Sequence, residues 1–217
     1  MPKRMNLPDA ASVAASLGDG RLHAPSAARN LGAITDVLRA HGPKSGSALE
    51  IASGTGQHIV GFAGALPGVI WHPSDVDAAR RASVDAWARE AGLRNLRPAR
   101  DLDATTSGWG AGAGPQDLIY LGNLLHLIST PEARTLINEV VAALAPEGCF
   151  ILYGPFLRNG ATTSEGDAAF DASIRAADPE LGYKNDRDLS AWLVQAGLAR
   201  IQRVDMPANN LCFIARR

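Results

Sequence analysis

Residues 49–58 read LEIASGTGQH, and this stretch decides the fold. The apolar run at 48–52 is typical of a short buried strand, and Gly54 and Gly56 follow it directly. A helical pattern begins at about Gly56. Because glycine lacks a Cβ, these two residues allow a backbone turn with positive φ or the close approach of a ligand. A tight strand-to-helix turn without a ligand would use the same residues, so both interpretations stay open.

Strand and helix patterns alternate on both sides of this stretch. Before it, residues 26–41 have helical spacing, with Ser26 as the expected N-cap and Gly42-Pro43 as the stop. After it, the expected elements are the strand VIWHPSD (69–75), a helix over 77–92, the short strand LRPARDLD (96–103), the strand DLIYLGN (117–123), a helix over 131–148 and the strand CFILYGPF (149–156).

This alternation predicts an α/β fold with a doubly wound, Rossmann-like sheet, because parallel strands need crossover connections. Residues 198–217 contain two β-rich runs joined by MPANN, which is too short for a crossover. We therefore expect a mostly parallel sheet with an antiparallel last strand. The segment GWGAGAGPQ (108–116) is expected to be a flexible surface turn.

The predicted domain organisation has two parts. Residues 1–25 lack periodicity and are expected to form a mobile N-terminal arm that is a candidate lid. Residues 26–217 are expected to form one domain, in which 156–197 is longer than a connection needs. We expect this substrate-side insertion to carry two helices and to recognise the substrate.

Composition excludes several classes of protein. The chain has 217 residues with 46% hydrophobic and 20% charged residues, which is ordinary globular usage. A formal net charge of −1 gives no basic field for nucleic acid or an anionic membrane. Cys149 and Cys212 lie in apolar runs and are expected to be buried free thiols. The sequence contains no recognisable membrane span or secretory signal. The predicted location is the cytoplasm.

The glycine turn does not match the phosphate-binding motifs. A phosphate loop would need Lys after its last glycine, but Gln57 follows Gly56. A dinucleotide fingerprint is met only in part, because Ile59 stands where the third glycine belongs. Asp75 follows the turn by about twenty residues, where a carboxylate holds ribose hydroxyls. An adenosine ligand is therefore indicated.

Asp103 ends the next strand pattern, where a carboxylate can accept a hydrogen bond from an adenine amino group; Asp101 is the alternative. Each aspartate also fits a helix cap or a loop, and Asp75 could cap the helix that begins near Asp77. The joint placement of Asp75 and Asp103 carries the interpretation.

The chain resembles class I methyltransferases, and more closely the DUF938 (methyltransferase-like 26, UPF0585) family. The resemblance covers residues 21–217. It rests on APSAARN, LEIASGTGQH, WHPSDVD, AWAREAGLRN, the run through Leu125-His126, LYGPF, SEGDAAFD and MPANNL.

This resemblance implies a fold of the class I methyltransferase type and S-adenosylmethionine as cofactor. Glu50, Gly54 and Gly56 would shape the methionine pocket, Asp75 would hold the ribose, and Asp103 with Ala104 would hold the adenine. The full set of cofactor-binding residues that we predict is Arg29, Glu50, Ala52, Ser53, Gly54, Gly56, Asp75, Asp103, Ala104 and Asn123.

The candidate catalytic residues are His126, Asn123 and Tyr153, all near the carboxyl ends of expected strands. His126 could act as a base if its pKa were near neutrality, or it could be packed under a loop. Asn123 and Tyr153 could orient an acceptor by hydrogen bonds. Arg29 could contact the cofactor or pair with a helix carboxylate. Asn209 and Asn210 are the type of residue that a tight turn favours, so they need no other role.

No metal site is expected, since the histidines are dispersed and the cysteines form no C-x-x-C pair. Nucleic acid is a disfavoured acceptor, because LGNL follows the fourth strand in place of an Asp/Asn-Pro-Pro-Tyr tetrapeptide. The predicted function is direct methyl transfer to a small-molecule acceptor.

The alternative is a catalytically silent module that binds S-adenosylmethionine and senses it or docks a partner. An accessible Asn123-to-His126 pocket would favour the enzyme, and burial of both residues would favour the silent module. Homodimer formation is left open.

Overall fold

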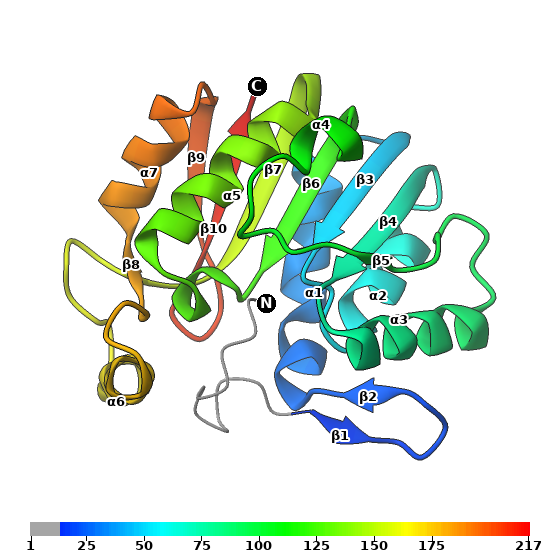
Figure 1. Cartoon of the computed structure of the whole chain (residues 1–217), viewed down its shortest axis with the longest axis horizontal. Coiled ribbons are helices and arrows are strands. Elements are labelled where there is room, and N and C mark those ends of the chain that lie inside the picture. The colour runs from blue at the N-terminus through cyan, green and yellow to red at the C-terminus, as the bar shows by residue number, and fades with distance from the viewer. Residues whose placement is uncertain (1–13) are drawn as a thin grey trace.

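The computed structural model describes residues 14–217, which form a central sheet with helices on both faces (Figure 1). The strands lie side by side in the order β5-β4-β3-β6-β7-β10-β9, and β8 pairs with β7. Their bounds are β3 Gly46–Ile51, β4 Val69–Asp75, β5 Arg100–Asp101, β6 Gln116–Gly122, β7 Leu144–Leu157, β8 Lys184–Asn185, β9 Ala199–Asp205 and β10 Asn210–Arg216.

The direction of the strands confirms the predicted fold class. β3 pairs in parallel with β4 and β6, and the same direction continues outward to β5 and β7. The last strand, β10, runs antiparallel between β7 and β9. The short turn between β9 and β10 reverses the chain, as the sequence predicts, and Met206 N donates to Asn210 O across it.

Two hydrophobic clusters hold the layers together. One lies between the sheet and α4, α5 and α7, and the other between the sheet and α1, α2 and α3. The carboxyl ends of the parallel strands therefore meet along one edge, between the two helical layers. The helices are α1 Pro25–His41, α2 Gln57–Ala65, α3 Ala78–Ala91, α4 Gly110–Ala113, α5 Thr130–Ala143, α6 Glu165–Ala177, α7 Asp186–Gln195 and the 3₁₀ helix η2 Leu125–Leu127.

The helix boundaries agree with the sequence at most ends. Gly92 closes α3 in the left-handed conformation, and Ser129 with Glu132 forms a capping box at the start of α5. The expected N-cap at Ser26 is wrong, because α1 begins one residue earlier, at Pro25, with Ala24 as its N-cap. Proline suits the first helical position, since its missing N–H would have no partner there.

The glycine-rich segment at 108–116 is not a flexible turn. It contains α4, which packs on α5. The carboxylate of Glu139 accepts hydrogen bonds from the backbone N–H groups of Gly108 and Gly110, at 2.8 and 2.7 Å. A Cβ at Gly110 would lie 2.3 Å from the Glu139 carbonyl oxygen, so the glycine allows the two helices to approach. This tertiary contact explains why the local composition misled the prediction.

Part of the predicted arm is attached to the domain. Residues 14–25 include a hairpin of β1 (Ala15–Ser16) and β2 (Leu22–His23), while residues 1–13 lie outside the described part of the chain. Leu22 N donates to Ser83 Oγ at 2.7 Å, and Trp87 Nε1 donates to Leu22 O at 2.9 Å. These bonds fix the hairpin against α3.

The insertion at 156–197 carries the two expected helices, α6 and α7, with β8 between them. Within residues 14–217, no helix combines the length and apolar character that a membrane span requires.

Candidate functional site

The loop after β3 is fastened to the end of β4. Three of its residues have positive φ, Ala52 at 54°, Gly54 at 60° and Gly56 at 94°. Its backbone donates to β4 twice, from Ser53 N to Ser74 O at 2.8 Å and from Gly54 N to an Asp75 carboxylate oxygen at 3.0 Å. The loop therefore has one defined shape, set by glycine geometry and by hydrogen bonds to β4.

Asp75 holds this loop and does not cap α3. Its second carboxylate oxygen accepts from Asp77 N at 3.0 Å, and its side chain is buried. Asp77 is the N-cap of α3, since its side chain accepts from Ala79 N and Arg80 N. The alternative in which Asp75 caps the helix is therefore wrong. A ribose contact by Asp75 stays a prediction.

Glu50, at the end of β3, is a buried acid with an unpaired oxygen. The residue is 2% exposed, and Oε2 has no hydrogen-bond partner within residues 14–217. Burial raises the pKa of Glu50 to about 8, against a hydrogen bond with Ser53 and with a further contribution from the charge of Asp75. The hydroxyl of Tyr120, the register partner of Glu50 on β6, also lacks a hydrogen-bond partner. Polar groups that are buried without partners are costly, and a bound ligand or an ordered water can supply the missing hydrogen bond.

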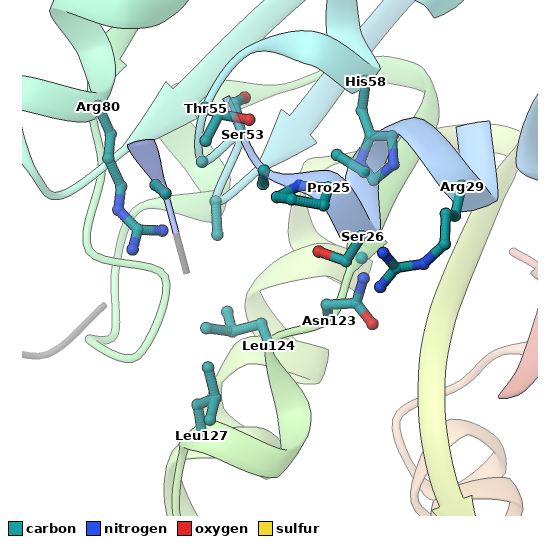
Figure 2. Close-up of a pocket in the computed structure, with 16 residues that line it drawn as sticks. Pro25, Ser26, Arg29, Ser53, Thr55, His58, Arg80, Asn123, Leu124 and Leu127 are labelled. Carbon is teal, nitrogen blue, oxygen red and sulfur yellow. The ribbon is translucent and has the colours of Figure 1, made fainter. Parts of the chain in front are cut away.

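A cleft of about 370 Å³ opens beside this loop, and we call it the loop cleft. Figure 2 shows its walls, which come from the start of α1 (24–29), the loop after β3 (52–55) and the segment after β6 (122–127). Ala14, His58 and Arg80 complete the lining. Of the predicted cofactor residues, Arg29, Ala52, Ser53, Gly54 and Asn123 line this cleft.

The other five predicted cofactor residues do not line the loop cleft. Glu50 and Asp75 are buried behind the loop. Gly56 is the N-cap of α2, where an added Cβ would lie 2.8 Å from the Val84 Cα. In the loop after β5, Asp103 Oδ1 accepts from Thr105 N, and Ala104 O accepts from Trp109 Nε1. An adenine contact by Asp103 and Ala104 therefore stays a prediction.

A second cavity of about 420 Å³ adjoins the loop cleft, and we call it the α6 cavity. It is lined by parts of α1, the segment after β6, the end of β7, α6, Tyr183 and the turn between β9 and β10. The predicted catalytic residues Asn123, His126 and Tyr153 all line it. Ser26, Arg29 and Asn123 line both spaces, so the loop cleft and the α6 cavity meet at these three residues.

His126 lines the α6 cavity as a neutral, buried ring. Burial, with a smaller contribution from the charge of Lys184, lowers its pKa to about 3, and Asp171 acts in the opposite direction. This pKa does not meet the condition for a base at neutral pH and favours the alternative of a histidine packed under a loop, and a catalytic role for His126 stays a prediction. Lys184 is held behind this ring by the carbonyl oxygens of Ile128 and Gly182. An accessible Asn123-to-His126 pocket is the criterion that would favour an enzyme, and it is met only in part. Both residues line the cavity, but His126 is buried and Asn123 is half-buried.

A hydrogen-bond chain connects the two spaces. His58 lines the loop cleft, and its Nε2 lies 2.6 Å from Asn30 Oδ1. Burial lowers the pKa of His58 to about 4, against a hydrogen bond with the Ala27 backbone, so the ring is neutral near pH 7 and carries one N–H. Asn30 Nδ2 then donates to the Tyr153 hydroxyl oxygen over 3.5 Å.

Several lining residues are absent from the predicted site. Asp167 and Phe170 belong to SEGDAAFD, the motif that carried part of the resemblance, so a signal for them existed. Thr55 likewise belongs to LEIASGTGQH, whereas Tyr183 and Arg80 had no such signal. Asn210 lines the α6 cavity in addition to its place in the expected turn. No group of three metal-binding side chains occurs within residues 14–217.

Comparison with known sequences and structures gives a family and a fold. The sequence matches the family described as "Protein of unknown function (DUF938)" over residues 21–217. Similar solved structures include one from Nostoc punctiforme PCC 73102 that is assigned provisionally to the O-methyltransferases, with a TM-score of 0.78 and 20% identity over 89% of this chain and 57% of that one.

Two further structures have the same fold. An O-methyltransferase family 2 protein from Planctomyces limnophilus DSM 3776, in complex with apigenin, has a TM-score of 0.74 and 20% identity over 88% of this chain and 60% of its own. Human N-acetylserotonin methyltransferase, in complex with S-adenosylmethionine, has a TM-score of 0.66 and 14% identity over 86% of this chain and 54% of its own. This chain thus spans a little over half the length of these three structures.

Proposed function

We propose that this chain, which belongs to the DUF938 family, binds S-adenosylmethionine in the loop cleft and transfers its methyl group to a small molecule in the α6 cavity. The observation that carries this proposal is the meeting of the two spaces at Ser26, Arg29 and Asn123. Methyl transfer needs a donor carbon and an acceptor atom in contact, and two adjoining spaces with one shared boundary meet that need.

The residues around the loop cleft fit the cofactor. Its amino acid end carries an ammonium and a carboxylate. The unpaired Glu50 oxygen suits the ammonium, and the Ser26 hydroxyl suits the carboxylate. When bound, the cofactor would supply an electrophilic methyl group on a sulfonium. Asp75 would act mainly by holding the loop, with a ribose contact as a further role.

The chain's own part in the reaction is to align the two reactants and to exclude water. Alignment of this kind can lower a barrier by roughly 7–11 kcal/mol in favourable cases. Asn123 has a φ of 55° and is fixed by a hydrogen bond from its backbone N–H to Tyr153 O. Its amide is therefore held at the boundary between donor and acceptor.

Calorimetric titration tests the proposal. We expect saturable binding of S-adenosylmethionine and S-adenosylhomocysteine, and no binding of NAD. Asp75→Asn should weaken cofactor binding about tenfold, because the loop loses its carboxylate partner. Asp36→Asn is the matched control, since Asp36 is a mostly exposed aspartate on α1.

Circular dichroism would show whether each variant is folded. Binding of NAD in preference to S-adenosylmethionine would contradict the proposal. Cofactor binding without transfer to any acceptor would favour the silent module over the enzyme.

A further inference from the structure

The α6 cavity has a wall of three rings, from His126, Phe170 and Tyr183. The ring centroid of His126 lies 5.9 Å from that of Phe170 and 6.1 Å from that of Tyr183, and the last two are 6.2 Å apart. All three residues line the cavity. Such a wall favours a flat apolar group, because ring edges and faces pack well against another ring.

The two charged side chains that line the α6 cavity have different surroundings. Asp167 Oδ2 accepts hydrogen bonds from Thr163, Ser164 and Asn209, and Oδ1 accepts a long one from the Tyr183 hydroxyl. Arg29 has no ion-pair partner among residues 14–217.

Arg29 also lies at the boundary with the loop cleft, and Figure 2 shows its guanidinium pointing toward Ser26 and Asn123. A positive charge is therefore available where the methyl group would arrive. A guanidinium in this place favours an anionic group on the acceptor.

None of the titratable side chains that line the α6 cavity and have a shifted pKa can take up a proton near neutral pH. Burial lowers the pKa of His126 to about 3 and raises the pKa values of Tyr153 and Tyr183. Burial acts to raise the pKa of Asp167, but its hydrogen bonds outweigh burial and hold that pKa below the ordinary value. The charged groups behind the ring wall, Lys184 and Asp171, are both buried.

We propose that the methyl acceptor is an aromatic carboxylate, with its ring against the three-ring wall and its carboxylate beside Arg29. This inference rests on the proposed function. An alcohol or a phenol would have to lose a proton to a base, and an ammonium group would be repelled by Arg29. A carboxylate is already an anion at neutral pH and needs no base.

The step balances without a proton. A carboxylate oxygen forms a bond to the methyl carbon, the bond from that carbon to sulfur breaks, and the electron pair stays on sulfur. The products are a neutral methyl ester and S-adenosylhomocysteine. The negative charge of the acceptor and the positive charge of the sulfonium are both lost, so no base and no acid is required.

Binding is measured first, on the protein saturated with S-adenosylhomocysteine. The probes are phenylacetate and 2-phenylethanol, which share a ring and differ in the reacting group. We expect phenylacetate to bind about tenfold more tightly, and Arg29→Gln to remove that difference without weakening 2-phenylethanol. Arg39→Gln is the control, an exposed arginine farther along the same helix.

Transfer is measured next, with S-adenosylmethionine labelled in its methyl group. The acceptors are benzoate, phenylacetate, 3-phenylpropionate and indole-3-acetate, beside 2-phenylethanol, 2-phenylethylamine and thiophenol. We expect product that releases labelled methanol in alkali, which identifies a methyl ester, and a kcat that is constant from about pH 6 to 8 because no protein group must lose a proton.

Two results would overturn the inference. One is transfer to the alcohol, amine or thiol in preference to every carboxylate. The other is bound cofactor with no methyl ester from any of the four carboxylates. Failure of wild-type protein to bind S-adenosylmethionine would instead contradict the proposed function, so the two failures are distinguishable.

Discussion

Replacing Glu50 by glutamine should make the protein more stable and bind the cofactor less well. Glu50 is buried at the end of β3, and one of its oxygens has no partner. Its pKa is raised from 4.5 to about 8, mainly by burial. The folded protein therefore keeps a proton on Glu50 at neutral pH that the unfolded chain has released. Glutamine has nearly the same shape and carries no charge in either state.

The sign and size of the effect follow from linkage. Between pH 4.5 and about 8 the folded state binds one proton more than the unfolded state at Glu50, so raising the pH destabilises the fold by about 1.4 kcal/mol per pH unit. At pH 7 the accumulated cost is on the order of 3 kcal/mol. Glu50→Gln removes this cost, and its advantage over wild type should vanish near pH 4.5, where Glu50 is protonated in both states.

Urea denaturation of both proteins at several pH values between 5 and 8 measures this difference. The other ionisable groups cancel in the comparison, so the difference in unfolding free energy should rise with pH for Glu50→Gln. A difference that is independent of pH would refute the reasoning, because Glu50 would then be charged in the folded protein.

The same variant should bind S-adenosylmethionine about tenfold or more weakly, if the Glu50 carboxylate receives the ammonium of the cofactor. In wild type, cofactor binding should release a proton below pH 8, since the bound ammonium favours the ionised carboxylate. Calorimetry in two buffers of different ionisation enthalpy measures that proton. Unchanged affinity together with no proton release would assign Glu50 a purely structural role.

Two further predictions concern the α2 glycines and the α6 cavity. Gly56→Ala should lower the unfolding free energy by roughly 1–3 kcal/mol, because φ is 94° and the new Cβ would meet the α3 backbone. Gly64→Ala should raise the unfolding free energy by about 0.5–1 kcal/mol in the same denaturation assay, because a Cβ at Gly64 would enter open space. Tyr153→Phe should leave the circular dichroism spectrum unchanged and raise the KM for the acceptor about tenfold, since a hydroxyl that Asn30 orients is lost. An unchanged KM would show that the Tyr153 hydroxyl does not contact the acceptor.

Most of the fold is readable from the sequence because it depends on local patterns. The apolar runs that predict the strands, such as 69–75 and 117–123, lie within a residue or two of β4 and β6. The segment 108–116 is different, because its helix depends on Glu139, which lies about thirty residues away and accepts from its backbone. Composition alone indicates flexibility there, and only the fold supplies the partner.

The candidate site is predictable in position and less so in chemistry. Asn123, His126 and Tyr153 are predicted from strand ends, and the sheet brings all three to the α6 cavity. The pKa of His126 could not be predicted, because it depends on burial and on Lys184, which is far away in sequence. The loop-fastening role of Asp75 likewise needs the distance between two strand ends.

Some of the strained and unsatisfied groups of residues 14–217 lie near the space where the two reactants would meet. Ala52 and Asn123 are not glycines, yet they have φ values of 54° and 55° and line the loop cleft. Such residues cost on the order of 1–3 kcal/mol each, and the surrounding hydrogen bonds must hold them. Glu50 and Tyr120 add two buried polar atoms without partners on the neighbouring strands. These residues destabilise the fold at the carboxyl edge of the sheet, where doubly wound folds bind ligands. This is the pattern expected when a bound ligand supplies the missing contacts.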